Sequence, residues 1–457
     1  MNTPTDPRNT IDESAMTSAM MIVVAITVFL NAMDGFDVLA ISFAAPGISA
    51  EWGISQTALG FVLAAELVGM AFGSILLGGV ADKYGRRTTL LGCLIVMSAG
   101  MFLATTSSSA NILMVWRVLT GLGIGGMLSC TNATVAEFSN TKWRSMCISL
   151  MVIGYPLGGV IGGEIAQKYL LVNFDWRSVF YFGSIVTGCL IPVVYFLVPE
   201  SVHWLTRKQP ENALEKINNS LTRLGHAVIS VLPEVHQDEK NKSVGDIFSK
   251  SLAMITILVT AAYFLHITTF YFILKWTPKI VADMGFEAAA AGGVLKWANI
   301  GGVLGGITFG VLTARFGLKP LTIGILFLTT VGVAVFGRTP EDLGRMELLA
   351  AFAGFFGNAG VSGLYSIVAY SFPTHVRATG TGFVIGVGRA GAVLSPILAG
   401  VMFDAGSTLP TVALVMGSGS AMAAIVLIFL KLNDDRPAET PVTDHVNAEG
   451  MAPAASG

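Results

Sequence analysis

Two acidic residues, Asp34 and Asp37, lie near one end of an apolar run that covers roughly residues 18–44 and is long enough to cross a bilayer. A spacing of three residues puts both side chains on one face of a helix. Placing a carboxylate in hydrocarbon costs at least ~2.5 kcal/mol of free energy. The pair must therefore have a partner, be reached by water, or be protonated. Burial and mutual repulsion favour the protonated form of a carboxyl group, and a nearby arginine favours the ionised form. We therefore expect this pair to bind and release protons.

The composition indicates a polytopic membrane protein. Of 457 residues, 53% are hydrophobic and 12% are charged, whereas about a quarter of a soluble domain is charged. The net charge of −2 gives no electrostatic support for a nucleic-acid partner. The four cysteines fall in or beside apolar runs without the spacing of metal ligands, so we expect packing thiols and no metal site.

Apolar runs predict twelve membrane-spanning helices and no strands. Six spans precede a polar stretch of about fifty residues and six follow it. In the polar stretch, Pro210 is expected to open an amphipathic helix with Ile217 and Leu221 on its apolar face, and Gly225 to end it. The predicted organisation is an N-terminal tail (1–17), a first six-helix bundle (18–198), a connector (199–249), a second bundle (250–431) and a C-terminal tail (432–457).

The two halves of the chain repeat each other. The run GGVADKYGRR, which begins at Gly78, follows the second span, and the related run GVLTARFGLK, which begins at Gly310, follows the eighth. Arg144, between spans four and five, corresponds to Arg377, between spans ten and eleven. Because each half has an even number of crossings, the halves share one orientation and are related by a pseudo-two-fold axis along the membrane normal. This is the architecture of a transporter built from two bundles.

The loop after the second span has a mechanical interpretation. Gly78 and Gly85 permit close helix approach and a tight turn, while Asp82 can pair with Arg86 and Arg87. Such pairs can latch one conformation and open in another. The alternative is that the basic residues only fix the topology, since cytoplasmic loops are enriched in lysine and arginine.

This loop and the paired acids also carry a family resemblance. The pattern Gly-x-x-x-Asp-Lys-x-Gly-Arg-Arg from Gly78 resembles the loop signature of the major facilitator superfamily. Within it, Asp34-Gly35-Phe36-Asp37 resembles the mark of the aromatic acid:proton symporters, bacterial carriers of benzoate and hydroxybenzoate acids. Glu137 with Arg144, and the segment around Arg377, also resemble family features, over roughly residues 20–430. Ala314 departs from the pattern, because it replaces the acid in the second copy of the loop.

The resemblance implies that Asp34, Asp37, Asp82, Arg117 and Arg389 are needed for transport. From their depth in spans four and one, Arg117 and Asp37 could form a pair, with a purely structural salt bridge as the alternative. Arg389 lies near mid-membrane, where a guanidinium needs an anion. We expect that anion to be either the substrate carboxylate, which suits the forked arginine head, or Glu66 on span two.

The remaining candidates are assigned to gating and to the substrate pocket. Glu164 and Lys296 are expected to form a gating pair across the halves. Four other charged residues are also expected to take part in gating: Glu66, Glu137, Arg144 and Arg377. His266 is expected either to relay protons and contact substrate or to be a hydrogen-bonded packing residue. The residues expected to line the substrate pocket with Arg117 and Arg389 are Phe36, Tyr155, Trp297, Asn358 and His266.

Together these features predict a proton-coupled importer of an aromatic carboxylate in the bacterial inner membrane. With both termini in the cytoplasm, about 18 of the 27 lysines and arginines fall on that side. The alternatives are a sugar or polyol symporter, a drug:proton antiporter and a receptor that does not transport. The two G-x-G-x-x-G runs, at Gly121 and Gly386, lie inside spans without a preceding strand, so we expect no nucleotide site, cofactor or enzymatic activity. The expected partners are the substrate, protons and the lipid bilayer, with no obligate protein partner.

Overall fold

The computed structural model describes residues 6–233, 247–249, 252–372 and 376–430. Within these residues, twelve helices are long and apolar enough to cross a membrane, which confirms the predicted all-α fold. The helices of the first half are α2 (Ser18–Trp52), α3 (Gln56–Tyr84), α4 (Arg86–Thr105), α5 (Ala110–Glu137), α6 (Arg144–Ile165) and α8 (Arg177–Leu197). A π-helical turn, η1 (Ala166–Leu170), and α7 (Leu171–Asn173) extend α6. Those of the second half are α11 (Ala253–Asp283), α12 (Ala288–Phe316), α13 (Leu318–Phe336), α14 (Leu343–Ser371), α15 (Arg377–Asp404) and α16 (Leu409–Phe429).

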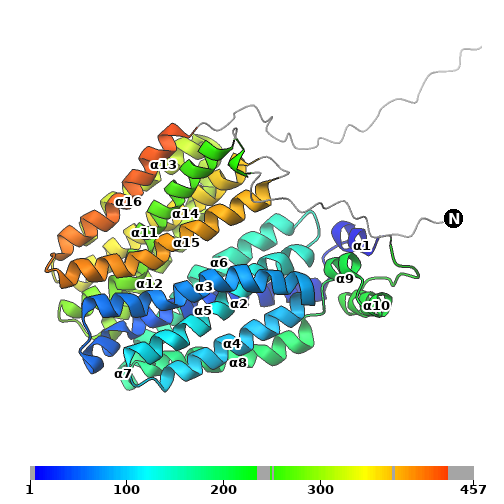
Figure 1. The fold of residues 1–457 in the computed structure, drawn as a ribbon, viewed down its shortest axis with the longest axis horizontal. Helices are drawn as coiled ribbons and strands as arrows, with labels where there is room; N and C mark the ends of the chain where they lie inside the picture. Colours follow the sequence, from blue (N-terminus) through cyan, green and yellow to red (C-terminus); the bar gives the residue numbers. More distant parts are fainter. Residues whose placement is uncertain (1–5, 234–246, 250–251, 373–375, 431–457) are drawn as a thin grey trace, which may run out of the picture.

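The helices form two bundles that lie side by side (Figure 1). In the first half α3 packs on α5, α2 on α6 and α4 on α8. The second half repeats these pairings, with α12 on α14, α11 on α15 and α13 on α16. Between the halves the main contacts join α3 to α15, α6 to α12 and α2 to α11. The repeat seen in the sequence is therefore also a repeat of helix packing.

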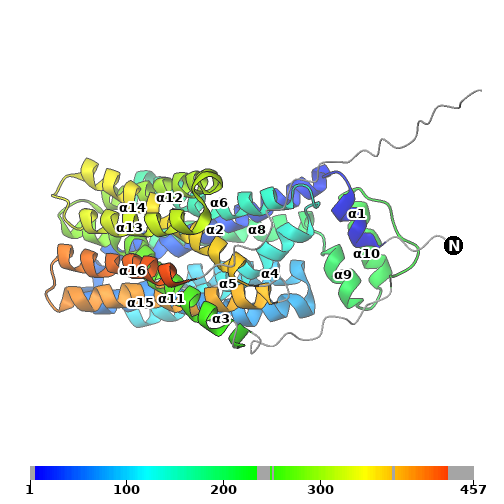
Figure 2. The same cartoon turned by 90° about the horizontal axis from the view of Figure 1, so that it is seen from above.

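Three short helices lie together beyond one end of the first bundle: α1 (Pro7–Glu13), α9 (Val202–Lys208) and α10 (Ala213–Leu224) (Figures 1 and 2). We call this the connector end and the opposite end of the molecule the far end. Ile217 and Leu221 are buried as predicted, and Gly225 ends α10 with φ of 80°. The helix begins at Ala213 instead of Pro210, because Asn212 has φ of 58°, outside the right-handed helical region.

Backbone contact between α2 and α6 fixes the position of the paired acids. A Cβ atom added at Gly35, between Asp34 and Asp37, would lie 2.0 Å from the carbonyl oxygen of Tyr155. A Cβ atom at Gly158 would lie 1.7 Å from the carbonyl oxygen of Ala32. Small residues allow helices in a membrane to approach this closely. The acids are thus held on a helix that has little room to shift.

We predict that Gly158→Val destabilises the protein by about 1–3 kcal/mol or more, because the added methyl groups must separate α2 from α6. Gly92→Val is the matched control, since a Cβ atom at Gly92 meets no atom within 4 Å. The measurement is the thermal unfolding midpoint of the purified variants in detergent. Equal midpoints for the two variants would contradict the close packing of α2 on α6.

Candidate transport site

Five titratable side chains, four from the first half and one from the second, are enclosed in the interior of the molecule. Asp34, Asp37, Glu66, Arg117 and Lys275 are each 0% exposed. Glu66 of α3 forms an ion pair with Arg117 of α5. Lys275 of α11, in the other half, lies 3.7 Å from the same Glu66 oxygen. Because a buried charge is costly unless it is paired, Glu66 is the acceptor that keeps both cations in place.

The structure corrects the predicted partner of Arg117. Its guanidinium pairs with Glu66 and donates a hydrogen bond of 2.8 Å to the backbone carbonyl of Asp37, not to the Asp37 carboxylate. The Asp37 side chain lies instead beside Gly183 and Thr187 of α8. Depth along two helices predicts which residues share a level, but the pairing also depends on the rotation of each helix about its axis.

The carboxyl groups of Asp34 and Asp37 are enclosed without hydrogen-bond partners. None of their four oxygens accepts a hydrogen bond from the described residues. Neither side chain forms an ion pair within this part of the chain. A buried carboxyl group without donors is less costly when it carries a proton than when it is ionised.

Arg389 has no acidic partner among the described residues. This arginine of α15 is partly buried and donates to the hydroxyl oxygen of Ser74 on α3, at 2.5 Å, and more weakly to the Met70 carbonyl, at 3.5 Å. Glu66, the alternative partner, is occupied by Arg117 and Lys275. The guanidinium can therefore still accept a carboxylate from a bound molecule.

A cluster of four tyrosines from both halves includes two that lie close to Arg389. Tyr263 of α11 donates to Tyr365 of α14 over 3.3 Å. The hydroxyl of Tyr155 on α6 lies next to that of Tyr271 on α11, across the boundary between the halves. Tyr263 and Tyr271 are both within electrostatic range of Arg389. A cation beside aromatic rings and hydroxyl groups can bind an aromatic acid at its carboxylate, its ring and its ring substituents.

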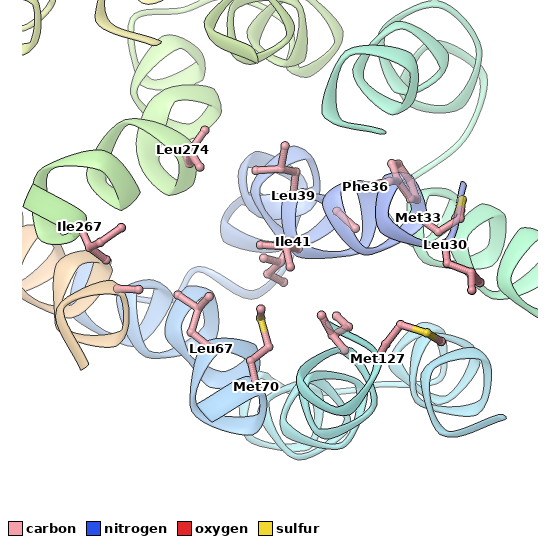
Figure 3. Close-up of a cluster of buried hydrophobic side chains, with 14 of the residues drawn as sticks. Leu30, Met33, Phe36, Leu39, Ile41, Leu67, Met70, Met127, Ile267 and Leu274 are labelled. Atoms are coloured by element: carbon pink, nitrogen blue, oxygen red, sulfur yellow. The ribbon is translucent and has the colours of Figure 1, made fainter. Parts of the chain in front are cut away.

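Two predicted substrate residues belong to the protein core. Phe36 is 2% exposed, contacts Phe182 edge to face at 5.3 Å, and lies among the buried apolar side chains of Figure 3. His266 is fully buried, and its ring nitrogens contact Ser420 at 2.8 Å and the Gly357 carbonyl at 2.9 Å. Both ring nitrogens are thus engaged within the second half, which matches the packing alternative for His266.

Two further candidates make contacts with other residues. Asn358 of α14 donates to the Gly302 carbonyl of α12 at 2.7 Å and joins two helices of the same half. Trp297 is 38% exposed and lines a surface hollow with Glu164 and Lys296. Among the side chains expected to contact substrate, Tyr155 belongs to the tyrosine cluster and Arg389 is within electrostatic range of two of its members.

Ion pairs at the connector end hold the loop after α3 in place. Arg86 contacts Asp82 at 2.9 Å and Glu137 at 3.0 Å, and Arg207 of α9 contacts Asp82 at 3.2 Å. Glu200 accepts hydrogen bonds from the backbone N–H groups of Arg86, at 2.7 Å, and Arg87, at 3.2 Å, where α4 begins. Burial raises the pKa of the Glu200 carboxyl. These contacts join the first bundle to the connector and do not cross between the halves.

The other gating candidates at this end are placed differently. Gly85 has φ of 102°, a left-handed conformation that favours glycine, and Gly78 faces Ser129 of α5. Arg144 forms an ion pair of 2.5 Å with Asp12 of α1. Arg377 begins α15, and its side chain lies outside the described part of the structure.

The far end is closed by contacts between the halves. Lys296 of α12 contacts Glu164 of α6 at 2.6 Å and Gln167 at 3.2 Å, which is the geometry predicted for the gating pair. Asp404, at the end of α15, accepts from the backbone N–H groups of Gln56, at 2.9 Å, and Thr57, at 2.8 Å. These N–H groups begin α3 and have no partner within the helix, so a carboxylate there is favourable.

For the described residues, hydrogen bonds between the two bundles lie at mid-depth or toward the far end. Among the charged residues involved, Lys275 and Asp404 are not predicted as site residues from the sequence. The sequence does contain a signal for Lys275: a lysine inside the apolar run of α11 is as unusual as Arg389 and indicates a functional site in the same way.

Comparison with known proteins identifies relatives and a shared fold. The profile of the Major Facilitator Superfamily matches residues 24–341 and 298–449. A 4-hydroxybenzoate transporter of Pseudomonas aeruginosa is 29% identical over 93% of this chain and 98% of its own length. A benzoate transport protein of Acinetobacter baylyi is 28% identical over 85% of each chain, and a gallate transporter of Pseudomonas putida is 26% identical over 94% and 95%. The crystal structure of a D-xylose-proton symporter matches with a TM-score of 0.71 and 16% identity, over 92% of this chain and all of that chain.

We predict that charge reversal at either member of the Glu164–Lys296 pair opens the far end, because it puts like charges in contact. A cysteine at Gly292 of α12 can report opening, since its Cβ atom would meet Phe43 of the other half at 3.4 Å. In a background lacking the four native cysteines, either single reversal should speed alkylation of this cysteine at least about twofold, and the double reversal should restore the slow rate.

Glu341→Lys on an exposed far-end loop is the matched control and should leave the rate unchanged. Fast alkylation in the double reversal would show that the two side chains do not act as a pair.

Proposed function

Because the chain belongs to the Major Facilitator Superfamily, we propose that it imports an aromatic carboxylate of the benzoate or hydroxybenzoate type together with protons. The transport would occur by alternating access across a bacterial inner membrane. The relatives named for 4-hydroxybenzoate, benzoate and gallate carriage support this substrate class.

The observation that carries the proposal is the environment of Arg389. Its guanidinium bonds to a serine hydroxyl of the other half and has no acidic partner among the described residues. Four tyrosines, two of which are within its electrostatic range, supply aromatic faces and hydroxyl groups nearby. A sugar has no carboxylate to match the guanidinium, and a cationic drug would be repelled by it, so the site favours an aromatic anion.

In the proposed cycle, Asp34 and Asp37 bind protons and Arg389 binds the carboxylate. Protonation of the acids lowers their repulsion toward the incoming anion. Arg117 acts through Glu66, since its guanidinium is already engaged there and on the Asp37 carbonyl. The two bundles, residues 18–198 and 250–431, then rock about the site to expose it on the other side.

We assign the connector end to the cytoplasm, with both termini on that side. The basic run Lys83, Arg86 and Arg87 lies at this end and supports the assignment under the positive-inside rule. The structure, with its halves bonded at mid-depth and at the far end, would then be closed toward the outside. The ion pairs of Asp82 with Arg86 and Arg207 would hold the loop and the connector to the first bundle during rocking.

The substrate class is tested by uptake of radiolabelled compounds into proteoliposomes, with and without an inward proton gradient. The panel contains benzoate, hydroxybenzoates, protocatechuate, gentisate and phenylpropionates, with a sugar as control. We expect gradient-dependent accumulation of at least one aromatic acid. Uptake of the sugar alone, or no accumulation of any acid, would contradict the proposal.

Replacing Asp34 or Asp37 by asparagine should abolish accumulation against a gradient, because an amide has nearly the shape of a carboxyl group but does not exchange a proton at neutral pH. Both variants should still insert in the membrane, since the native carboxyl groups accept no hydrogen bonds from the described residues. Accumulation and membrane level are measured in the same cells. Full uphill uptake by both variants would exclude these acids as the proton sites.

A further inference from the structure

Lys275 connects the second half of the protein to the buried acids of the first half. We propose that Lys275 couples closure of the far end to proton release: its ammonium group enters the acid cluster as the halves close and takes the place of a proton. The proposal rests on the proposed proton-coupled function and adds a residue to its mechanism.

Within the described part of the chain, the polar contacts of the Lys275 ammonium lie across the boundary between the halves. The side chain starts from α11 and is 0% exposed. Its ammonium donates a hydrogen bond of 2.5 Å to the Val38 carbonyl of α2 and lies 3.7 Å from Glu66 of α3. Both groups belong to the first half, so any movement that separates α11 from α2 and α3 removes the ammonium from both.

The charge balance of the cluster then depends on the conformation. Asp34, Asp37 and Glu66 contribute three carboxyl groups, and Arg117 and Lys275 contribute two cations, so the cluster is neutral when one proton is bound to the Asp34–Asp37 pair. Arg117 is in the same half as the acids and stays with them. Departure of Lys275 leaves −1, and a second proton restores neutrality. Because uncompensated buried charge is costly, the ammonium and a proton are alternatives at this site.

Other charged or titratable groups face the cluster but do not replace Lys275 in this role. Arg389 of α15 is within electrostatic range of Asp34 but bonds to Ser74. Tyr155 and Tyr271 face Glu66 from α6 and α11, and a neutral phenol does not change the charge count. Cys93 of α4 is buried and lies within electrostatic range of Asp34. The groups that face the cluster are thus Asp34, Asp37, Glu66, Cys93, Arg117, Tyr155, Tyr271, Lys275 and Arg389.

The order of events follows from this exchange. With the far end open, the cluster lacks the ammonium and takes a proton from the side to which the far end opens. When the far end closes, Lys275 returns to Glu66 and Val38, and the proton is released toward the connector end. The exchange would make proton movement depend on the same motion that carries the substrate.

The test uses the full-length chain with the four native cysteines replaced and the cysteine reporter at position 292. Its alkylation rate is measured without substrate between about pH 5 and pH 9. The rate is divided by that of an exposed cysteine, Glu341→Cys, at the same pH, because only the thiolate reacts and its fraction falls with the pH. Protonation weakens the hold on Lys275, so this ratio should rise as the pH falls, by up to about tenfold per pH unit for one linked proton. In Lys275→Gln the ratio should be high and independent of pH. In this variant Glu66 still forms its ion pair with Arg117, so its buried carboxylate is not left without a partner.

Two further variants separate charge from packing. Lys275→Arg keeps a permanent positive charge and should keep the pH dependence. Lys279→Gln, one turn along α11, removes a lysine that pairs with Asp283 on its own helix and should behave as the parent. The proposal fails if the parent shows no pH dependence, if Lys275→Gln retains it, or if Lys275→Arg loses it as Lys275→Gln does.

Transport assays in the same preparations add a second readout. Lys275→Gln should still exchange labelled substrate across the membrane. Under a proton gradient of one pH unit it should accumulate at least about tenfold less substrate than the parent, because each coupled proton contributes a tenfold accumulation ratio per pH unit. Accumulation at the parental level would overturn the proposal. If the parent accumulates no aromatic acid, the proposed function fails, and the alkylation series still decides the role of Lys275.

Discussion

The pairing of Glu66 with Arg117 is the constraint on which the centre of the molecule depends. Each side chain is completely enclosed, and removing either would leave a charge buried without its partner, which typically costs about 3–5 kcal/mol. The pair joins α3 to α5. It also gives Lys275 an acceptor and holds the Arg117 guanidinium against the backbone beside the paired acids.

The polar contacts differ along the length of the molecule. Lys296 and Asp404 tie the bundles together at the far end, while Arg389 and Lys275 do so at mid-depth. At the connector end, the ion pairs of Asp82 serve the first bundle and the connector. Because Arg389 and Lys275 each bond to the opposite half, rocking of the bundles must change the surroundings of both cations together. In the proposed cycle, this links anion binding and proton binding to the same movement.

Much of the fold could be predicted from sequence, because hydrocarbon requires long apolar helices and these leave a strong pattern. The Glu164–Lys296 pair could also be predicted, since both residues lie at the same level near the ends of neighbouring spans. Partners deep in the bundle could not. The pairing of Arg117 depends on the rotation of α2, α3 and α5, and an apolar helix that is buried on several sides gives little periodicity from which to infer rotation.

In the candidate site, too, some residues could be predicted from the sequence and others could not. The sequence identified Arg389 because a guanidinium at mid-membrane is unusual. It did not separate Tyr155, which lies in the tyrosine cluster, from Phe36, which packs against Phe182, because an aromatic residue suits both environments equally well. The closeness of Asp404 to the start of α3 depends on how the two halves meet, which no local pattern encodes.

The proposed cycle carries aromatic acid and protons across the membrane together. A pH-sensitive dye enclosed in proteoliposomes detects this when the acid is added outside at equal pH on both sides, with the membrane potential clamped. We expect the lumen to acidify at a rate that follows substrate uptake and saturates with it, after subtraction of the signal from protein-free liposomes. Saturable uptake with no acidification beyond that control would contradict the proposed cycle.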